Sequence, residues 1–156
     1  MTDVPARPRV YLDTNVFIRD FEGAEAEAKP LRELFDALRL DAKRAVTSEL
    51  TLAEVLAPSK NGPELHIKRR FYLALIASTG FIDLLPVNRS ILIETADLRK
   101  VAKHRLPDAI HVVTAIRAGC GFFMSSDRDM KKLPKGMRLI PPDSTGIATL
   151  LGTTNA

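Results

Sequence analysis

The sequence contains few of the residues on which disulfide-bonded, zinc-binding or membrane proteins depend. Cys120 is the single cysteine among 156 residues, so neither an internal disulfide nor a cysteine zinc site can form. The histidines at 66, 104 and 111 do not have a metal-binding spacing such as HExxH. The longest uncharged apolar run, FYLALIA at 71–77, is too short to span a bilayer, and the first ten residues lack the apolar core of a signal peptide. We therefore expect a cytoplasmic protein without a membrane segment, with Cys120 as a small core residue.

Neither basic nor acidic residues are in large excess. The chain carries 23 basic and 19 acidic residues, for a net charge of +4, and its hydrophobic content of 46% supports one sizeable core. If several acidic residues converge on one site, the remaining surface is markedly basic, which suits a polyanionic substrate. From the net charge alone, a merely soluble basic protein is the simpler interpretation.

Apolar segments of strand length alternate with segments of helical periodicity. This alternation predicts a parallel sheet covered by helices on both faces. We expect a domain over residues 1–143 and a flexible tail over 144–156, with at most one short turn of helix. The predicted strands are 10–17, 45–47, 81–87, 121–125 and 137–140, and the predicted helices are 29–40, one capped by Ser48, 64–78, 90–103 and 107–119.

Four acidic residues stand where these apolar segments give way to a loop or a helix. An unpaired buried charge costs several kcal/mol, so four such residues call for a common explanation. A shared divalent cation such as Mg²⁺ is the simplest, because hard cations take oxygen ligands. All four can point at the carboxyl edge of the sheet, where function collects in such folds. They are Asp13 in VYLDTNVF, Glu54 in TSELTLAEVL, Asp108 in RLPDAIHVVTA and Asp127 in GFFMSSDRD.

Each of these residues also has an ordinary structural role open to it. Asp13 could form an Asx-turn, and Asp108 could complement the positive end of its helix. Glu54 could be a solvated residue of an amphipathic helix, and Asp127 could begin a loop. Taken together, the order Asp, Glu, Asp, Asp on alternating elements favours a shared site.

The segments VYLDTNVFI, TSELTLAEVL, LPDAIHVVTAI and FFMSSDRDM resemble the PIN domain family, and within it the VapC-type toxin ribonucleases. The resemblance covers nearly the whole chain. It implies a three-layer α/β/α fold with a central, mostly parallel sheet of four to five strands. It also implies an endoribonuclease that depends on Mg²⁺ or Mn²⁺, forms a homodimer, and is blocked by an antitoxin that wraps around it.

Matched position by position, the resemblance assigns metal binding and catalysis to Asp13, Glu54, Asp108 and Asp127. Thr14 and Ser126 match polar neighbours that help to order such a site, although Ser126 replaces a more frequent Asn. Asp129 is a possible extra acid, but a solvated loop residue is the favoured interpretation. Metal-activated hydrolysis needs no histidine as base. We expect His111 to pack on its helix, and His66 and His104 to be exposed.

Two basic stretches are candidates for contact with RNA, although a solvated helix face is an equal alternative for each. Contacts with phosphate give affinity without sequence preference. The second stretch is the better candidate because it adjoins Asp108. The candidate residues are Lys68 and Arg69 in the first stretch, and Arg99, Lys103 and Arg105 in the second. The apolar residues Phe17, Ile18 and Phe21 could form a partner surface or pack in the core.

Three other functions stay open. A housekeeping RNA-processing PIN nuclease would share the same four acidic residues. A haloacid-dehalogenase-like phosphatase also places an aspartate after its first strand, but usually has a second two residues later, where this chain has Asn15. A non-catalytic PIN-like binding module would be marked by loss of an acidic residue, and all four are present.

Overall fold

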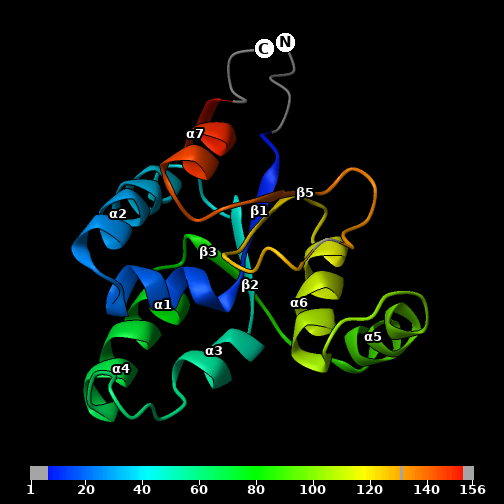
Figure 1. Ribbon diagram of the computed structural model, residues 1–156, viewed down its shortest axis with the longest axis horizontal. Helices are drawn as coiled ribbons and strands as arrows, with labels where there is room; N and C mark the ends of the chain where they lie inside the picture. Colours follow the sequence, from blue (N-terminus) through cyan, green and yellow to red (C-terminus); the bar gives the residue numbers. More distant parts are fainter. Residues whose placement is uncertain (1–6, 131, 153–156) are drawn as a thin grey trace.

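The computed structural model describes residues 7–130 and 132–152. Within these residues, five parallel strands form one sheet in the order β3-β2-β1-β4-β5 (Figure 1). The expected α/β fold with a central parallel sheet is confirmed. The strands are β1 (Arg9–Leu12), β2 (Ala45–Ser48), β3 (Ile82–Leu85), β4 (Cys120–Met124) and β5 (Arg138–Ile140).

Helices cover both faces of the sheet and complete three layers. One layer contains α1 to α4 and α7, and the other contains α5 and α6 (Figure 1). No helix in the part of the chain that the structure describes is long and apolar enough to cross a lipid bilayer. The helices are α1 (Thr14–Glu22), α2 (Glu25–Arg39), α3 (Leu50–Val55), α4 (Leu65–Tyr72) with a π-helical continuation at Leu73–Ser78, α5 (Arg89–Val101), α6 (Leu106–Arg117) and α7 (Ser144–Gly152).

The side chains of β1 alternate between the two layers. Val10 and Leu12 belong to the core under α1 and α2, whereas Tyr11 belongs to the core under α6. Because both faces are covered, the three central strands are buried along almost their whole length. Cys120 is buried on the α6 side, as expected. The alternation also directs Tyr11 towards the helix that carries Asp108.

The first predicted strand extends too far. β1 ends at Leu12, and α1 begins at Thr14, whose N–H donates to the carboxylate of Asp13. Asp13 therefore caps α1, which stabilises a helix start. Phe17 continues the apolar run in sequence but packs inside the core, stacked on Phe35. Of the other two apolar residues considered for a partner surface, Phe21 is half-buried and Ile18 is exposed.

The expected flexible tail from residue 144 is wrong for residues 144–152, which form α7. Ile147 and Leu150 are buried in the larger core cluster, three residues apart on one helix face. Gly146 permits this packing, because a Cβ there would lie 1.8 Å from the carbonyl oxygen of Pro141. The buried side chains of Ile147 and Leu150, and the close contact of Gly146 with Pro141, pack α7 against the core. Residues 153–156 lie outside the described residues.

Candidate active site

The order of the strands reverses beside β1. β2 and β3 lie on one side of β1, and β4 and β5 lie on the other, so the carboxyl ends of β1 and β4 meet at a topological switch point. Asp13 directly follows β1, and its N–H donates to the carbonyl oxygen of Met124 at the end of β4 (3.0 Å). The residues that follow these two strands are therefore neighbours, as the sequence predicts.

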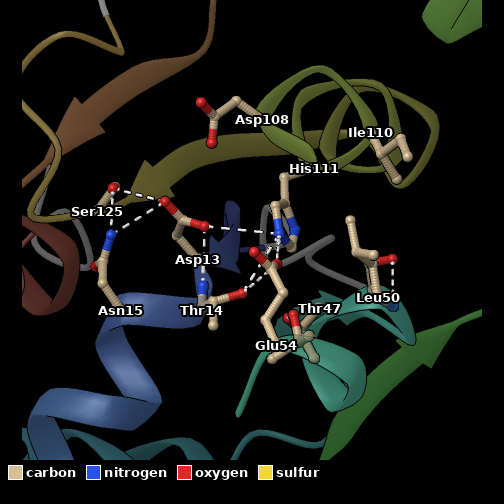
Figure 2. A network of polar contacts seen from close by, with 12 residues as sticks. Asp13, Thr14, Asn15, Thr47, Leu50, Glu54, Asp108, Ile110, His111 and Ser125 are labelled. Atoms are coloured by element: carbon tan, nitrogen blue, oxygen red, sulfur yellow. Dashed lines mark hydrogen bonds and ion pairs between the residues drawn. The ribbon is translucent and has the colours of Figure 1, made fainter. Parts of the chain in front are cut away.

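Asp13 is held in place through both carboxylate oxygens. Its Oδ1 accepts the N–H of Thr14 (2.8 Å), and its Oδ2 accepts the Oγ–H of Ser125 (2.7 Å) and an Nδ2–H of Asn15 (3.2 Å). The residue is 5% exposed. A carboxylate with this many donors is fixed in position before any ligand arrives (Figure 2).

The serine hydroxyl that bonds to Asp13 belongs to Ser125 and not to Ser126. Besides its bond to Asp13, the Oγ of Ser125 accepts an amide N–H of Asn15 (2.9 Å) and the backbone N–H of Asp127 (3.0 Å). Ser126 is exposed and donates its backbone N–H to Oδ1 of Asn15 (2.9 Å). Ser125 thus contributes its hydroxyl to this edge, whereas Ser126, the residue named from the sequence, contributes its backbone N–H.

A second chain of hydrogen bonds joins Glu54 on α3 to His111 on α6 (Figure 2). Oε1 of Glu54 lies 2.5 Å from Nε2 of His111 and accepts the Oγ1–H of Thr14 (2.8 Å). The Nδ1 of His111 lies 2.5 Å from the hydroxyl of Tyr11. Burial acts to raise the pKa of Glu54, but the hydrogen bond and charge of His111, with the Thr14 hydroxyl, lower it below its ordinary value. Glu54 is thus half-buried and paired, and not a freely solvated helix residue.

Asp108 and Asp127 complete the acidic edge. Asp108 lies in the first turn of α6, above Asp13 in Figure 2. Burial raises the pKa of Asp108, and the charges of Asp13 and Asp127 raise it further, against the lowering effects of Arg105 and His111. Asp127 accepts the N–H of Asp129 through Oδ1 (2.9 Å), which forms the turn after β4. Asp13 and Asp127 therefore both lie close enough to Asp108 to disfavour its ionised form.

A sequence model of the PIN domain family matches residues 10–136. The chain belongs to the PIN domain family. PIN domains are nucleases, enzymes that hydrolyse phosphodiester bonds. The matched range contains all four predicted acidic residues and the His111 network.

Solved structures similar to this PIN domain come from toxin–antitoxin systems. A chain of a toxin–antitoxin complex from Klebsiella pneumoniae is 28% identical, with a TM-score of 0.61, over 85% of this chain and 97% of that one. A chain of VapBC2 from Rickettsia felis, bound to a DNA fragment from their promoter, is 15% identical, with a TM-score of 0.60 over the same shares. The second likeness shows the fold alone. A search of curated proteins gave no match.

The donor atoms of this PIN domain suit a hard divalent cation. Carboxylate oxygens are the ligands that Mg²⁺ and Mn²⁺ prefer, and the repulsion at Asp108 is a charge excess that a cation would relieve. Within residues 7–130 and 132–152, however, no three acidic, imidazole or thiol side chains are grouped closely enough to hold a metal ion. The residues fit a cation by chemistry and charge, although their side chains are not gathered around one point.

Lys68 is buried, unlike the exposed helix face predicted from the basic stretch at 66–70, and its placement does not support contact with RNA. Its side chain is 4% exposed and its ammonium group donates to the carbonyl oxygen of Ala57 (3.1 Å) and to Oγ of Ser59 (3.0 Å). It also lies 3.7 Å from a carboxylate oxygen of Glu22. The lysine thus ties α4 to the loop after α3. The other four candidates, Arg69, Arg99, Lys103 and Arg105, are exposed.

The sequence interpretation missed His111, Tyr11, Ser125 and Asn15 as members of the site. His111 follows Asp108 by three residues, so both lie on one face of α6, and this spacing was visible in the sequence. A lone histidine in an apolar helix is nevertheless more often a packed core residue. His66 is exposed, as expected, whereas His104 is half-buried.

Proposed function

We propose that this PIN domain is an endoribonuclease that depends on Mg²⁺ or Mn²⁺, and that it is the toxin of a toxin–antitoxin pair. The observation that carries the nuclease proposal is the placement of Asp13, Asp108 and Asp127 at the carboxyl edge of the sheet, where burial and the charges of Asp13 and Asp127 raise the pKa of Asp108. The likeness to a chain of the Klebsiella pneumoniae toxin–antitoxin complex supports the toxin role. The family match favours this function over a haloacid-dehalogenase-like phosphatase.

Asp13, Glu54, Asp108 and Asp127 would hold the cation. When bound, Mg²⁺ or Mn²⁺ would supply the positive charge that activates a water molecule and stabilises charge on the phosphate. Asp13 contributes a carboxylate already fixed by its capping bonds and by Ser125. Thr14 and His111 hold the carboxylate of Glu54 through hydrogen bonds. The protein thus supplies acidic groups whose orientation is set before RNA binds.

Arg105 is the best placed of the candidate RNA-binding residues. Its side chain is 87% exposed, and its Nε lies 3.7 Å from a carboxylate oxygen of Asp108. A phosphate drawn to this guanidinium would therefore lie beside the acidic edge. Arg99 and Lys103 are exposed in the segment that leads to α6, whereas Arg69 stands on α4, in the opposite layer of helices. RNA is the polyanion expected in the cytoplasm, where we place the protein.

The proposal includes two protein partners. An antitoxin would block the acidic edge, in keeping with the toxin–antitoxin complex that contains a similar chain. A second copy of the chain would form a homodimer. Neither partner is needed for the chemistry described above, because all four acidic residues come from one chain.

The purified protein is expected to cleave RNA in the presence of Mg²⁺ or Mn²⁺ and to be inactive in excess chelator. Carboxylates without a cation cannot neutralise the charge that develops on the phosphate. Gel electrophoresis of a labelled RNA, and of a DNA of the same sequence, measures both metal dependence and substrate class. Undiminished cleavage in chelator would contradict metal dependence, and preference for the DNA would contradict the assignment as a ribonuclease.

Expression of the protein alone is expected to arrest growth of a bacterial host, because unregulated RNA cleavage depletes essential transcripts. The measurement is the number of colonies formed with and without inducer. Asp108→Asn should restore growth. Normal growth with high levels of soluble protein that cleaves RNA in vitro would instead favour the housekeeping RNA-processing nuclease.

A further inference from the structure

We infer that His111 is a positioning residue that, held by Tyr11, fixes the carboxylate of Glu54 for binding of the divalent cation. The inference rests on the proposed function, since it assigns Glu54 to a metal site. His111 is 1% exposed and lies between the two residues, with one ring nitrogen directed at each (Figure 2).

The hydroxyl of Tyr11 is the partner of Nδ1 of His111. Its oxygen accepts the backbone N–H of Ser48 at the end of β2 (3.2 Å), and its one proton can then be donated to Nδ1 of His111 (2.5 Å). The Tyr11 ring is fully buried and stacks on Phe123, with centroids 5.0 Å apart. With Nδ1 facing Tyr11, the Nε2 that faces Glu54 is a donor in the imidazolium and in the neutral ring that carries its proton on Nε2.

The Nε2–H of His111 then donates to Oε1 of Glu54 at 2.5 Å. The same oxygen accepts the hydroxyl proton of Thr14 at 2.8 Å. Both donors hold a single oxygen of the carboxylate, and Oε2 makes no hydrogen bond to any residue that the structure describes. A carboxylate held by one oxygen can present the other to a cation, as carboxylate ligands with supporting hydrogen bonds commonly do.

Glu54 needs this support because of the helix that carries it. α3 has only six residues and is followed by a break rich in Pro, Gly and Ser at 58–63. A helix of this length is weakly stable by itself. α6, in contrast, has twelve residues, almost all buried after its first turn, and carries both Asp108 and His111. The His111–Glu54 bond thus ties the acidic residue of the short helix to the helix that supplies Asp108.

A purely structural role for His111 would be to satisfy the buried hydroxyl of Tyr11. Two amide substitutions separate the two roles, because they have the same chemistry and differ in reach. In His111→Asn the amide lies where Nδ1 lies and can still meet Tyr11. In His111→Gln the amide extends to the position of Nε2 and can still donate to Glu54.

The experiment titrates the full chain with Mn²⁺ by calorimetry, without RNA. We expect His111→Asn to weaken Mn²⁺ binding by about 10-fold or more, which is the usual effect of losing a residue that orients a metal ligand. His111→Gln should bind Mn²⁺ nearly as well as the wild type. Tyr11→Phe, which keeps the ring and removes only the hydroxyl, should weaken binding less than His111→Asn. His66→Gln, at a side chain that is 77% exposed, is the matched control and should change nothing.

Cleavage rate against Mn²⁺ concentration provides the second readout. A residue that acts through Glu54 should raise the Mn²⁺ concentration needed for half-maximal cleavage, and the rate should recover at saturating Mn²⁺. Equal Mn²⁺ affinities of His111→Asn and His111→Gln, whether both normal or both weak, would overturn the inference, as would a rate that stays low at saturation. If His111→Asn does not fold, unchanged Mn²⁺ affinity of a folded Tyr11→Phe would overturn it instead. Absence of Mn²⁺ binding to the wild type would overturn the proposed function as well.

Discussion

Replacement of Asp108 by Asn should lower RNA cleavage by about 100-fold or more and, at the same time, raise the melting temperature of the metal-free protein. The loss of activity follows because a metal-ligating carboxylate contributes several kcal/mol to stabilisation of the transition state, and each 1.36 kcal/mol corresponds to about tenfold in rate. The measurement is kcat/KM on a labelled RNA at saturating Mg²⁺.

The gain in stability has a different origin. Burial and the charges of Asp13 and Asp127 disfavour the ionised form of Asp108, so an amide removes a repulsion that the metal-free fold contains. We expect a rise of about 2 °C, which for a chain of this length corresponds to less than about 1 kcal/mol. Mg²⁺ should raise the melting temperature of the wild type by mass action, and raise that of the variant less.

Asp97→Asn is the matched control, because it removes the same charge from an exposed position on α5, where Asp97 pairs with Lys100. Its cleavage and its response to Mg²⁺ should equal those of the wild type. A lower melting temperature for metal-free Asp108→Asn, with no effect of Mg²⁺ on the wild type, would show that Asp108 only stabilises its helix. Asp13→Asn is a poorer test, since it also disturbs the bonds to Thr14 and Ser125.

Replacement of Asp20 by Asn should stabilise the protein at pH 8 by up to about 3 kcal/mol, and by much less at pH 4.5. Asp20 is 9% exposed on α1, and its Oδ1 is buried without a hydrogen-bond partner in the part of the chain that the structure describes. Burial raises its pKa from 3.8 to about 6, against the lowering effect of Arg32 and Arg39. The difference between these two values, at about 1.36 kcal/mol for each pH unit, gives the upper limit.

The sign follows from proton binding by the two states. At pH values well below 3.8 both states carry the proton, and Asp20 costs nothing. Between 3.8 and about 6 the unfolded chain releases the proton first, so the stability of the folded state falls as the pH rises and then levels off. An asparagine does not ionise, so the variant does not lose stability in this way as the pH rises.

Urea denaturation of the wild type and of Asp20→Asn at the two pH values measures the difference in free energy of unfolding. Asp36→Asn is the matched control, because Asp36 is exposed on α2 and lines the same cavity of about 760 Å³ as Asp20. That control should have no pH-dependent effect of this size. An equal effect of Asp20→Asn at pH 4.5 and at pH 8 would show that the carboxyl is not destabilised by its burial.

The acidic edge was predictable because each acidic residue interrupts or closes an apolar run. That signal depends on local sequence and on one general rule, that parallel strands present their carboxyl ends together. The start of α1 was harder to predict from the sequence, because Val16 and Phe17 extend the apolar run of β1 and conceal the change from strand to helix. From the sequence, an Asx-turn and a place in the acidic site were alternative roles for Asp13. In the structure the same carboxylate both caps α1 and faces Asp108 (Figure 2).

Other errors arose from contacts between residues distant in sequence. Lys68 belongs to a run of basic residues that is typical of an exposed helix face. Its burial depends on the carbonyl oxygen of Ala57 and on the carboxylate of Glu22, which the run does not reveal. Similarly, His111 gains its significance from Tyr11, a hundred residues earlier, and from Glu54 on another helix. Periodicity assigns such side chains to a face and does not identify their partners.

Arg44 has a consequence for protein engineering. Its guanidinium donates to the carbonyl oxygens of Pro8 and Leu150 (both 3.0 Å), so one buried side chain spans the beginning of β1 and the end of α7. Pro8 lies at the amino end of β1, whereas Asp13 lies beyond its carboxyl end. A short linker between these neighbouring points would therefore permit circular permutation, with the new termini opened in the exposed break at 58–62. The rearranged chain would keep all four acidic residues of the edge within the same strands, helices and turns as before.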